Sequence, residues 1–479
     1  MNIYIPIEVK ARELEGKILL ALTAAERGHT VILGDKSDTR GLASKGVLPP
    51  GIVHNKSLTP GEKTMKLIRN LNDAGHIITS QDEESGLLDE SYDEFAKLRF
   101  SEDSIFKTGK VFAWGDHDAE SLKQTYHKYE EQIVATGSPR VDFWRDEFSG
   151  FYNTNPFHES HLELKPFILI SSNFGSFLNQ NRFFNVVARL RKAGYFDRDP
   201  DWERHQYENA AYQTRLIHEF VIMIRKLSET FPDHTILVRP HPIESEDGWK
   251  KIVGDYPNIK VLREGGINAW VRNASVMIHN GCTTAIEAAA AGLPRIAYRP
   301  IPSDIEREIP NKMSYNAFSQ EELVDIVSEI LNGKMPSGSG TVEEMTNELL
   351  NNRFANLNGT FAADRIVDEW EEFGTQLNNY QVSPDELITL KEAYKANSKS
   401  LKKSIKSGLA QMLKKTPFAE KESSKKDKLL TSDHKFPSFT DEEMSKMHQN
   451  LKSQLNRFIN IKVKPFGRRS FVMKGSPMV

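Results

Sequence analysis

The sequence predicts an α/β protein of two Rossmann-like domains that face a cleft, followed by a basic helical C-terminal tail. Three observations carry this prediction. Short apolar strands alternate with helical segments, the pattern of a parallel sheet. The 479 residues are too many for one hydrophobic core. The strand–helix series is also interrupted once, at 151–166, and then starts again.

The first domain is expected over 1–150. Strands are predicted at 2–7, 30–34, 76–79, 111–114 and 132–136 because these runs are apolar and β-branched. Between the first two, Leu14, Ile18 and Leu22 recur at the spacing of a helix, and Gly28 is placed to end it.

The second domain is expected over 167–380, after the polar crossing at 151–166. Predicted strands lie at 167–171, 235–239, 259–262, 276–278 and 295–298, with helices at 210–231, 283–291 and from 321 to about 376. Two such halves form the architecture called GT-B. Ligands of doubly wound sheets bind outside the carboxyl ends of the strands.

Composition narrows the class of protein. Apolar residues make up 38% and charged residues 27%, as in ordinary globular proteins. No apolar run is long enough for a transmembrane helix, and the N-terminus is typical of a strand rather than a signal peptide. Cys282 is the only cysteine, which excludes an internal disulfide and a cysteine-based zinc site. A cytoplasmic protein is expected.

Charge is distributed unevenly. Residues 391–479 hold 21 Lys and Arg against 8 Asp and Glu, although the whole chain has a net charge of −3. We expect 381–479 to form a basic helical or partly disordered tail. Such tails bind membranes, nucleic acid or acidic partners. Among these we expect the inner-membrane surface, with a solvated helix, a disordered spacer or a partner-docking site as alternatives, and no nucleic acid as partner.

The most informative motif follows the strand at 276–278. His279, Asn280 and Gly281 form a turn, after which Thr283 and Thr284 are placed to cap a helix whose free amides suit a nucleotide phosphate. Glu287, one helical turn later, is a candidate contact to a ribose hydroxyl. The alternative is a plain capped helix.

Two other strand ends in this half carry candidate donor contacts. Arg239, His241 and Pro242 follow the strand at 235–239, and they suggest phosphate contacts from a rigid turn. Asn173 and Ser176 lie in a small polar loop after the strand at 167–171. The alternatives are a rigid turn with an exposed histidine and an ordinary polar turn.

The first half supplies candidate catalytic and acceptor groups. Carboxylates at strand ends can act as acid, base or nucleophile, and the catalytic candidates are Asp82, Glu83, Glu84 and Asp142. Candidate contacts to the sugar or acceptor are Glu8, Lys10, Arg12, Glu13 and Arg140. The alternatives are solvated charged loops and a structural Arg–Asp pair.

Several enzyme classes are disfavoured. The Gly-x-Gly-x-x-Gly, Walker and His-Glu-x-x-His patterns are absent, which argues against dehydrogenases, P-loop NTPases and zinc hydrolases. No Asp-x-Asp metal motif follows a strand. We expect a mechanism without metal or cofactor.

These residues resemble bacterial surface-carbohydrate biosynthesis proteins of GT-B fold, which include retaining β-Kdo glycosyltransferases. The resemblance covers about 1–375. It is carried by the segments 5–14, 24–34, 82–84, 113–115, 136–142, 173–175, 239–242 and 279–288.

The resemblance implies transfer of a sugar to a glycan or lipid-linked acceptor. It implies a CMP-activated 3-deoxy-ulosonic acid as donor substrate, probed first as CMP-Kdo, with CMP held by the His-Pro motif and the Thr-Thr helix start. It also implies retention through a carboxylate nucleophile of the first half. Alternatives are a nucleotide-sugar epimerase or teichoic-acid-type polymerase on the same fold, and a non-catalytic nucleotide-binding scaffold.

Overall fold

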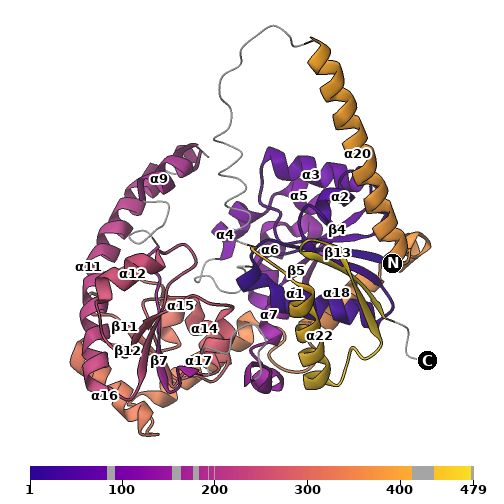
Figure 1. Ribbon diagram of the computed structural model, residues 1–479. Helices are drawn as coiled ribbons and strands as arrows, with labels where there is room; N and C mark the ends of the chain where they lie inside the picture. The colour runs from indigo at the N-terminus through magenta and orange to yellow at the C-terminus, as the bar shows by residue number, and fades with distance from the viewer. Residues whose placement is uncertain are drawn as a thin grey trace. The chain divides into compact units, whose positions relative to one another are not determined.

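The computed structural model describes residues 1–83, 92–153, 163–175, 183–192, 194–198, 200–412 and 436–475 (Figure 1). The chain divides into two compact units. Of the residues just named, those from 1 to 151 and from 352 onward belong to the first unit, and those from 152 to 351 belong to the second. Within the described ranges, no helix is both long and apolar enough to cross a membrane.

The first unit is built on an eight-stranded sheet in the order β13-β14-β2-β1-β3-β4-β5-β6. The strands from β2 to β6 are parallel, and their predicted positions are confirmed except for β3, which the sequence analysis missed. They are β1 (Asn2–Ile7), β2 (Thr30–Asp35), β3 (Ile52–Asn55), β4 (Ile77–Gln81), β5 (Lys110–Ala113) and β6 (Ile133–Ala135).

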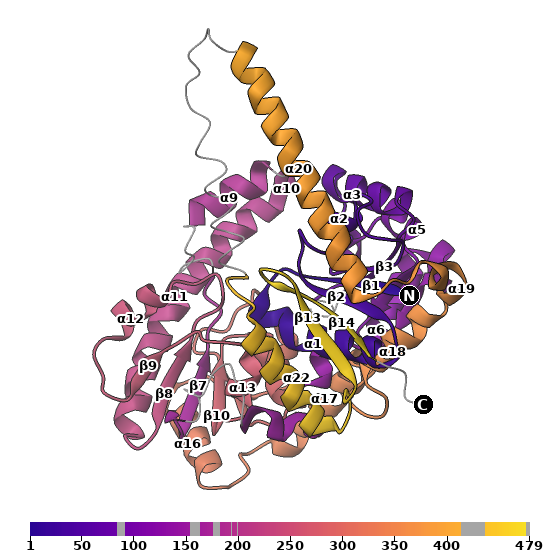
Figure 2. The same cartoon turned by 45° about the vertical axis from the view of Figure 1, so that its right-hand side comes forward.

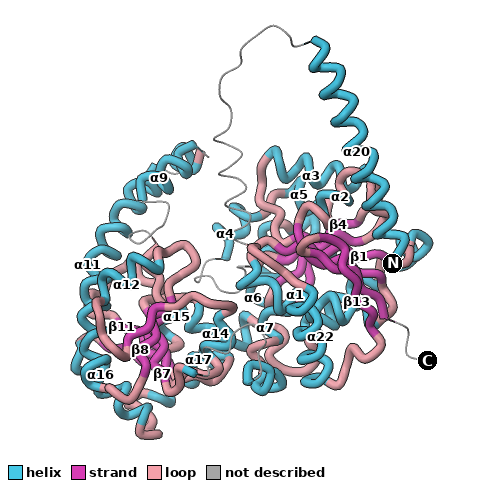
Figure 3. The backbone as a smooth tube through the Cα atoms, viewed as in Figure 1, coloured by secondary structure: helices cyan, strands magenta, loops and turns pink. Residues whose placement is uncertain are grey.

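Helices cover both faces of this sheet, as Figure 3 shows in cyan. They are α1 (Lys10–Glu26), α2 (Arg40–Ala43), α3 (Glu62–Asp73), α4 (Tyr92–Arg99), α5 (Glu102–Phe106), α6 (Asp116–Thr125), η1 (His127–Gln132), α7 (Pro139–Asp142) and η2 (Asp146–Asn153). Helix α1 approaches α7 closely, because a Cβ added to Gly16 would lie 2.8 Å from the Arg140 amide nitrogen.

The C-terminal part of the chain belongs to the first unit, which corrects two predictions. Residues 352–380 were expected in the second domain, and 436–475 in a tail. The hairpin of β13 (Ile461–Gly467) and β14 (Ser470–Gly475) instead adds to β2 in antiparallel register, and α22 (Asp441–Leu455) packs on α1 (Figure 2). Buried Phe471, Val472 and Met473 explain why these strands stay in the sheet.

The remaining helices between 352 and 412 are α18 (Ala362–Glu371), α19 (Gly374–Leu377), η3 (Asn378–Tyr380) and α20 (Pro384–Met412). Helix α18 packs on α1. The first turns of α20 lie against the hairpin, where Lys391 donates to the Phe466 carbonyl at 2.5 Å. The helical part of the tail prediction therefore agrees with α20, although this helix starts on the body of the first unit.

The second unit has a six-stranded parallel sheet in the order β12-β11-β10-β7-β8-β9. Five strands were predicted and β12 was not. The strands are β7 (Phe167–Ser171), β8 (Thr235–Arg239), β9 (Ile259–Val261), β10 (Val276–His279), β11 (Arg295–Tyr298) and β12 (Tyr315–Ala317). With this sheet, the predicted fold class of two Rossmann-like sheets is confirmed.

The helices of this unit include α11, which is longer than predicted. They are α9 (Phe183–Lys192), α10 (Tyr195–Arg198), α11 (Pro200–Thr230), α12 (Glu246–Val253), α13 (Ile267–Val271), α14 (Thr284–Ala290), α15 (Glu308–Lys312), α16 (Gln320–Leu331) and α17 (Ser339–Arg353). Helix α11 packs its apolar residues, such as Phe220 and Ile224, on the sheet.

Candidate functional site

The first candidate site lies where the connections of the second sheet change direction. Strands β7 and β10 are neighbours, but the chain leaves β7 toward β8 and leaves β10 toward β11. Loops at such a switch point separate and leave room for a ligand. Here the Asn280 side chain joins the two loops: its Oδ1 accepts from the Asn173 amide at 2.9 Å, and its Nδ2 donates to the Asn173 carbonyl at 3.2 Å.

A cavity of about 360 Å³ opens beside these loops. Its size is within the range of sites for small ligands. Three groups of residues form its walls: strand-end loops, one face of α11 and the loop before α15. They include Asn173, Asn280, Gly281, Tyr298, Arg299, His205, Gln206, Asn209, Tyr212, Gln213, Glu306 and Arg307.

The two arginines of the cavity are in different electrostatic states. Arg299 donates to Glu306 and, at 3.1 Å, to Asn316 Oδ1, so its charge is largely neutralised. Arg307 has no hydrogen bond or ion pair with any residue in the described part of the chain. It lies beside Gly281, whose φ of +76° is in the region that favours glycine. Among the described residues, no carboxylate therefore offsets the charge of Arg307, which lies in the cavity next to the loop at Gly281.

His279 and Arg239, two of the predicted donor contacts, shape this unit but do not line the cavity. His279 is fully buried: its Nδ1 accepts from the Gly281 amide at 3.0 Å, and its Nε2 lies 2.9 Å from Ser314 Oγ. Burial lowers the pKa of His279 to about 3, so the ring is neutral at pH 7. Arg239 donates to the carbonyls of Glu264 and Gly265, and burial lowers its pKa to about 10.

Of the other predicted donor residues, Asn173, Asn280 and Gly281 line the cavity, and those described next do not. Helix α14 begins as predicted, yet neither threonine caps it: the cap residue Thr283 makes no side-chain cap hydrogen bond, and Thr284 Oγ1 lies 3.2 Å from Cys282 Sγ. The predicted donor residues His241, Pro242 and Glu287 also do not line the cavity, and Glu287 is buried. Ser176 lies outside the described residues.

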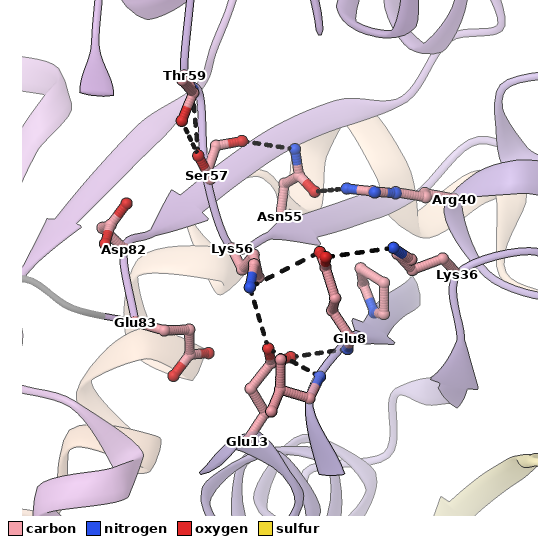
Figure 4. Close-up of polar contacts among 12 residues, drawn as sticks. Glu8, Glu13, Lys36, Arg40, Asn55, Lys56, Ser57, Thr59, Asp82 and Glu83 are labelled. Atoms are coloured by element: carbon pink, nitrogen blue, oxygen red, sulfur yellow. Dashed lines mark hydrogen bonds and ion pairs between the residues drawn. The ribbon is translucent and has the colours of Figure 1, made fainter. Parts of the chain in front are cut away.

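The second candidate site is at the carboxyl edge of the first sheet, where the switch point lies between β1 and β3 (Figure 4). Glu8 follows β1, Lys36 follows β2 and Lys56 follows β3. The Glu8 carboxylate lies 3.5 Å from Lys36 Nζ and 3.6 Å from Lys56 Nζ. These distances describe a loose cluster of opposite charges.

Below this cluster, Glu13, Lys17 and Glu83 form a buried charged group. Lys17 Nζ uses all three protons: it contacts Glu13 at 2.7 Å, Glu83 at 3.2 Å and the Pro6 carbonyl at 2.9 Å. Burial would raise the pKa of Glu13, but Lys17, Lys56 and the amide of Glu8 lower it to about 2. Burial raises the pKa of Glu83 above its ordinary value, and Lys17 partly offsets this.

The predicted catalytic carboxylates that the structure describes, Glu83, Asp82 and Asp142, have different partners. Glu83 lines a hollow of about 10 Å³ together with Arg12, Glu13 and Arg140, which is room for about one water. Asp82 is 2% exposed and accepts two hydrogen bonds from Arg99, at 2.8 and 3.0 Å. Glu84 lies outside the described residues.

Asp142 has a structural position that the sequence analysis did not identify. Its carboxylate accepts from Asn356 Nδ2 at 2.6 Å and from the amides of Ala362 and Ala363, at 2.9 and 3.1 Å, at the start of α18. Burial raises its pKa to about 7 despite these bonds. Because all of its contacts are internal, we no longer place Asp142 in the catalytic machinery. Lys10 is likewise engaged, by Glu443 of α22 at 2.5 Å.

Sequence reasoning missed Lys17, Lys36, Lys56, Arg299 and Arg307. Lys36 and Lys56 follow strands directly, so recognising β3 would have revealed Lys56. Lys17 occurs four residues after Glu13, a spacing that pairs charges on a helix. No pattern in the sequence distinguishes Arg307 from a loop arginine. Within the ranges described above, no group of three or more His, Cys, Asp or Glu side chains is arranged to hold a metal ion.

Comparison with known proteins gives weak likenesses only. No protein-family model matches the chain, and no curated protein matches it. A solved structure of a proposed UDP-N-acetylglucosamine 2-epimerase from Listeria monocytogenes aligns with 79% of this chain and 96% of its own, at 13% identity and a TM-score of 0.47.

Two other solved structures are similar to the chain at the same level. UDP-GlcNAc 2-epimerase from Methanocaldococcus jannaschii, in complex with UDP-GlcNAc and UDP, aligns over 77% of this chain and 99% of its own, at 13% identity and a TM-score of 0.43. A variant of the wall teichoic acid polymerase TagF aligns over 67% and 72%, at 10% identity and 0.42. At these values, we draw no conclusion about activity from the likenesses.

Proposed function

We propose that this chain is a glycosyltransferase whose second unit binds a nucleotide-activated sugar in the 360 Å³ cavity. One observation carries the proposal: Arg307, which has no hydrogen bond or ion pair with any described residue, lines a cavity at the switch point of a parallel sheet, beside Gly281. A phosphate group satisfies an arginine, and this is where doubly wound sheets bind nucleotides.

The wall opposite the strand ends suits the uncharged part of such a ligand. Gln206, Asn209 and Gln213 lie on one face of α11, where Gln213 Nε2 donates to Asn209 Oδ1 at 3.3 Å. A side-chain amide has both donor and acceptor atoms. Side-chain amides can form hydrogen bonds with the hydroxyl groups of a sugar or with the edge of a base. The resemblance noted above makes CMP-Kdo the first donor to test, and we propose transfer to a glycan or lipid-linked acceptor.

For the reacting carboxylate we propose Glu83. It follows β4 at the carboxyl edge of the first sheet and borders a hollow, whereas the carboxylates of Asp82 and Asp142 are each held by two or more hydrogen bonds. Lys17 fixes its orientation at 3.2 Å. Glu83 then serves as the nucleophile that retention requires, and Glu83→Gln is expected to lower turnover without an equal loss of donor binding.

Nucleotide binding tests the proposal most directly. Thermal stability is measured with CMP, CDP, UDP and GDP, because a bound ligand raises the unfolding temperature by mass action. Arg307→Gln is expected to weaken binding of the preferred nucleotide by about tenfold or more, as one lost charge-assisted bond implies. Arg215→Gln removes an exposed arginine of the same unit and is the matched control. Equal binding by both variants would refute the assignment of the cavity.

A second experiment distinguishes transfer from epimerisation. The protein is incubated with CMP-Kdo and an acceptor, and separately with UDP-GlcNAc alone. A new glycosidic product in the first reaction supports the transferase. Conversion of UDP-GlcNAc in the second reaction, with no product in the first, would favour the epimerase. A non-catalytic scaffold would be favoured if the unsubstituted protein shows no turnover in either reaction and Glu83→Gln still binds the nucleotide.

We further propose that the lysine-rich end of α20 brings the enzyme to an anionic membrane surface. The sequence places Leu401, Ile405, Leu409 and Met412 at helical spacing among several lysines, and the backbone of α20 is helical through Met412. Basic amphipathic helices of this kind lie in the membrane interface. The enzyme would then encounter a lipid-linked acceptor by diffusion in the plane of the membrane.

A further inference from the structure

The proposed function assigns no role to three cations at the carboxyl edge of the first sheet. Lys36 follows β2, Arg40 begins α2 and Lys56 follows β3, so the switch point brings together side chains from three segments (Figure 4). Figure 4 shows Lys36 and Lys56 approaching Glu8 from opposite sides, with Arg40 beside Asn55.

The acids nearby do not neutralise these cations. Glu8 is the carboxylate that both lysines approach, at 3.5 and 3.6 Å. Glu13 also lies 3.3 Å from Lys56, but its shorter contact, at 2.7 Å, is with Lys17. Glu83 is a second partner of Lys17, at 3.2 Å. Counted by ordinary ionisation at pH 7, the four cations Lys17, Lys36, Arg40 and Lys56 face the three acids Glu8, Glu13 and Glu83, so this edge carries a surplus of about one positive charge.

The position of Arg40, one of the cations that give this positive surplus, is fixed by a hydrogen bond within the fold. Its Nη1 donates to Asn55 Oδ1 at 2.6 Å, and no carboxylate of the described residues lies within ion-pair distance of its guanidinium. Asn55 Nδ2 in turn donates to the Ser57 carbonyl at 2.9 Å, which fixes the amide. Burial lowers the pKa of Arg40, as expected for a partly desolvated cation. The remaining guanidinium protons are available to a ligand.

We infer that Lys36, Arg40 and Lys56 form a binding subsite for a phosphate group. A phosphomonoester carries about −1.5 to −2 charges at pH 7, so these cations attract it more strongly than a carboxylate, which carries one. Arginine and lysine are also the side chains that bind phosphate oxygens best. This inference rests on the proposed function. If the chain is a glycosyltransferase, its acceptor is a phosphorylated molecule that binds at the same sheet edge as Glu83.

Phosphate binding is measured in the Arg307→Gln background, so that the cavity of the second unit does not contribute. Inorganic phosphate, acetate and glycerol are titrated at constant ionic strength, and the stabilisation of the protein gives each affinity. Phosphate is expected to bind at least tenfold more tightly than acetate, and glycerol not to bind. Arg40→Gln, and separately Lys36→Gln with Lys56→Gln, are each expected to weaken phosphate binding at least tenfold.

Lys462→Gln is the matched control, because Lys462 is an exposed lysine at the opposite edge of the same sheet. Phosphate affinities within twofold of this control for Arg40→Gln and for the double lysine variant would overturn the subsite. Acetate binding as tightly as phosphate would overturn the assignment to phosphate. If CMP fails to bind the protein with Arg307 intact while these results hold, the proposed function fails and the phosphate subsite remains.

Discussion

The ionisation of Glu13 is coupled to the fold through nearby lysines. The ordinary pKa of 4.5 falls to about 2 in the folded chain, because Lys17, Lys56 and two backbone amides outweigh the effect of burial. A lowered pKa stabilises the fold above pH 4.5, and the stabilisation is lost as the pH falls from 4.5 toward 2. The effect is on the order of 3 kcal/mol.

Unfolding by urea between pH 7 and pH 3 tests this. The stability of the unsubstituted protein is expected to fall more steeply below pH 4.5 than that of Glu13→Gln, which has no carboxylate to protonate. Glu62→Gln, an exposed acid on α3, serves as control and is expected to follow the unsubstituted protein. Parallel curves for all three proteins would contradict the coupling.

Single residues also show how far sequence reasoning reached into the site. Asn173, Asn280 and Gly281, three of the predicted donor contacts, line the cavity. Their place at strand ends could be located from apolar runs. His279 and Asp142 carried equally strong sequence signals, but their partners, Ser314 and Asn356, are distant in the chain. Whether a polar residue is satisfied internally depends on tertiary contacts, which one sequence does not contain.

Among the elements, α1 is the one whose packing constrains the first unit most tightly. A Cβ at Gly16 would lie 2.8 Å from Arg140 N and 2.9 Å from Pro139 C, and backbone atoms do not move aside cheaply. Gly16→Ala is therefore expected to destabilise the protein by about 1–3 kcal/mol, although alanine ordinarily favours a helix. Gly340→Ala in α17, which has open space around it, is the control and is expected to be neutral or stabilising. A stabilised Gly16→Ala would show that α1 and α7 are further apart.

The β13–β14 hairpin is the element that the sequence analysis placed wrongly. Lysines at Lys462, Lys464 and Lys474 give these strands the composition of a basic tail, and their pairing partner β2 lies more than 430 residues away. The apolar run of Phe471, Val472 and Met473 was the available signal. Strand β3 was missed for a related reason, since its four residues include His54 and Asn55.

Val472→Asp tests the position of the hairpin. Val472 is fully buried and pairs with Ile32 of β2, so an ionised side chain there would lose its hydration without a partner. We expect a loss of stability above about 3 kcal/mol or failure to fold. Lys462→Asp, on the exposed side of the same hairpin, is expected to change stability by less than about 0.5 kcal/mol. Similar effects of both substitutions would place the hairpin outside the sheet.

At the scale of the whole molecule, the position of the C-terminal segment decides how membrane binding is tested. Removing 391–479 would also remove β13, β14 and α22 from the first unit, so loss of binding would not be informative. Substituting Lys402, Lys403 and Lys406 by Gln keeps every element of the sheet. Each lysine near an anionic leaflet contributes about 1 kcal/mol, so the triple variant should bind about 100-fold more weakly.

Co-sedimentation with anionic and neutral vesicles measures this binding. The unsubstituted protein is expected to prefer anionic vesicles, and the preference should decrease as salt screens the charges. A control variant replaces three exposed lysines of the first unit, Lys63, Lys66 and Lys462, by Gln, and removes the same total charge. If net charge alone governs binding, both triple variants lose it equally, and the assignment to α20 fails. If the end of α20 is the contact, the control retains binding, because its lysines lie on α3 and β13.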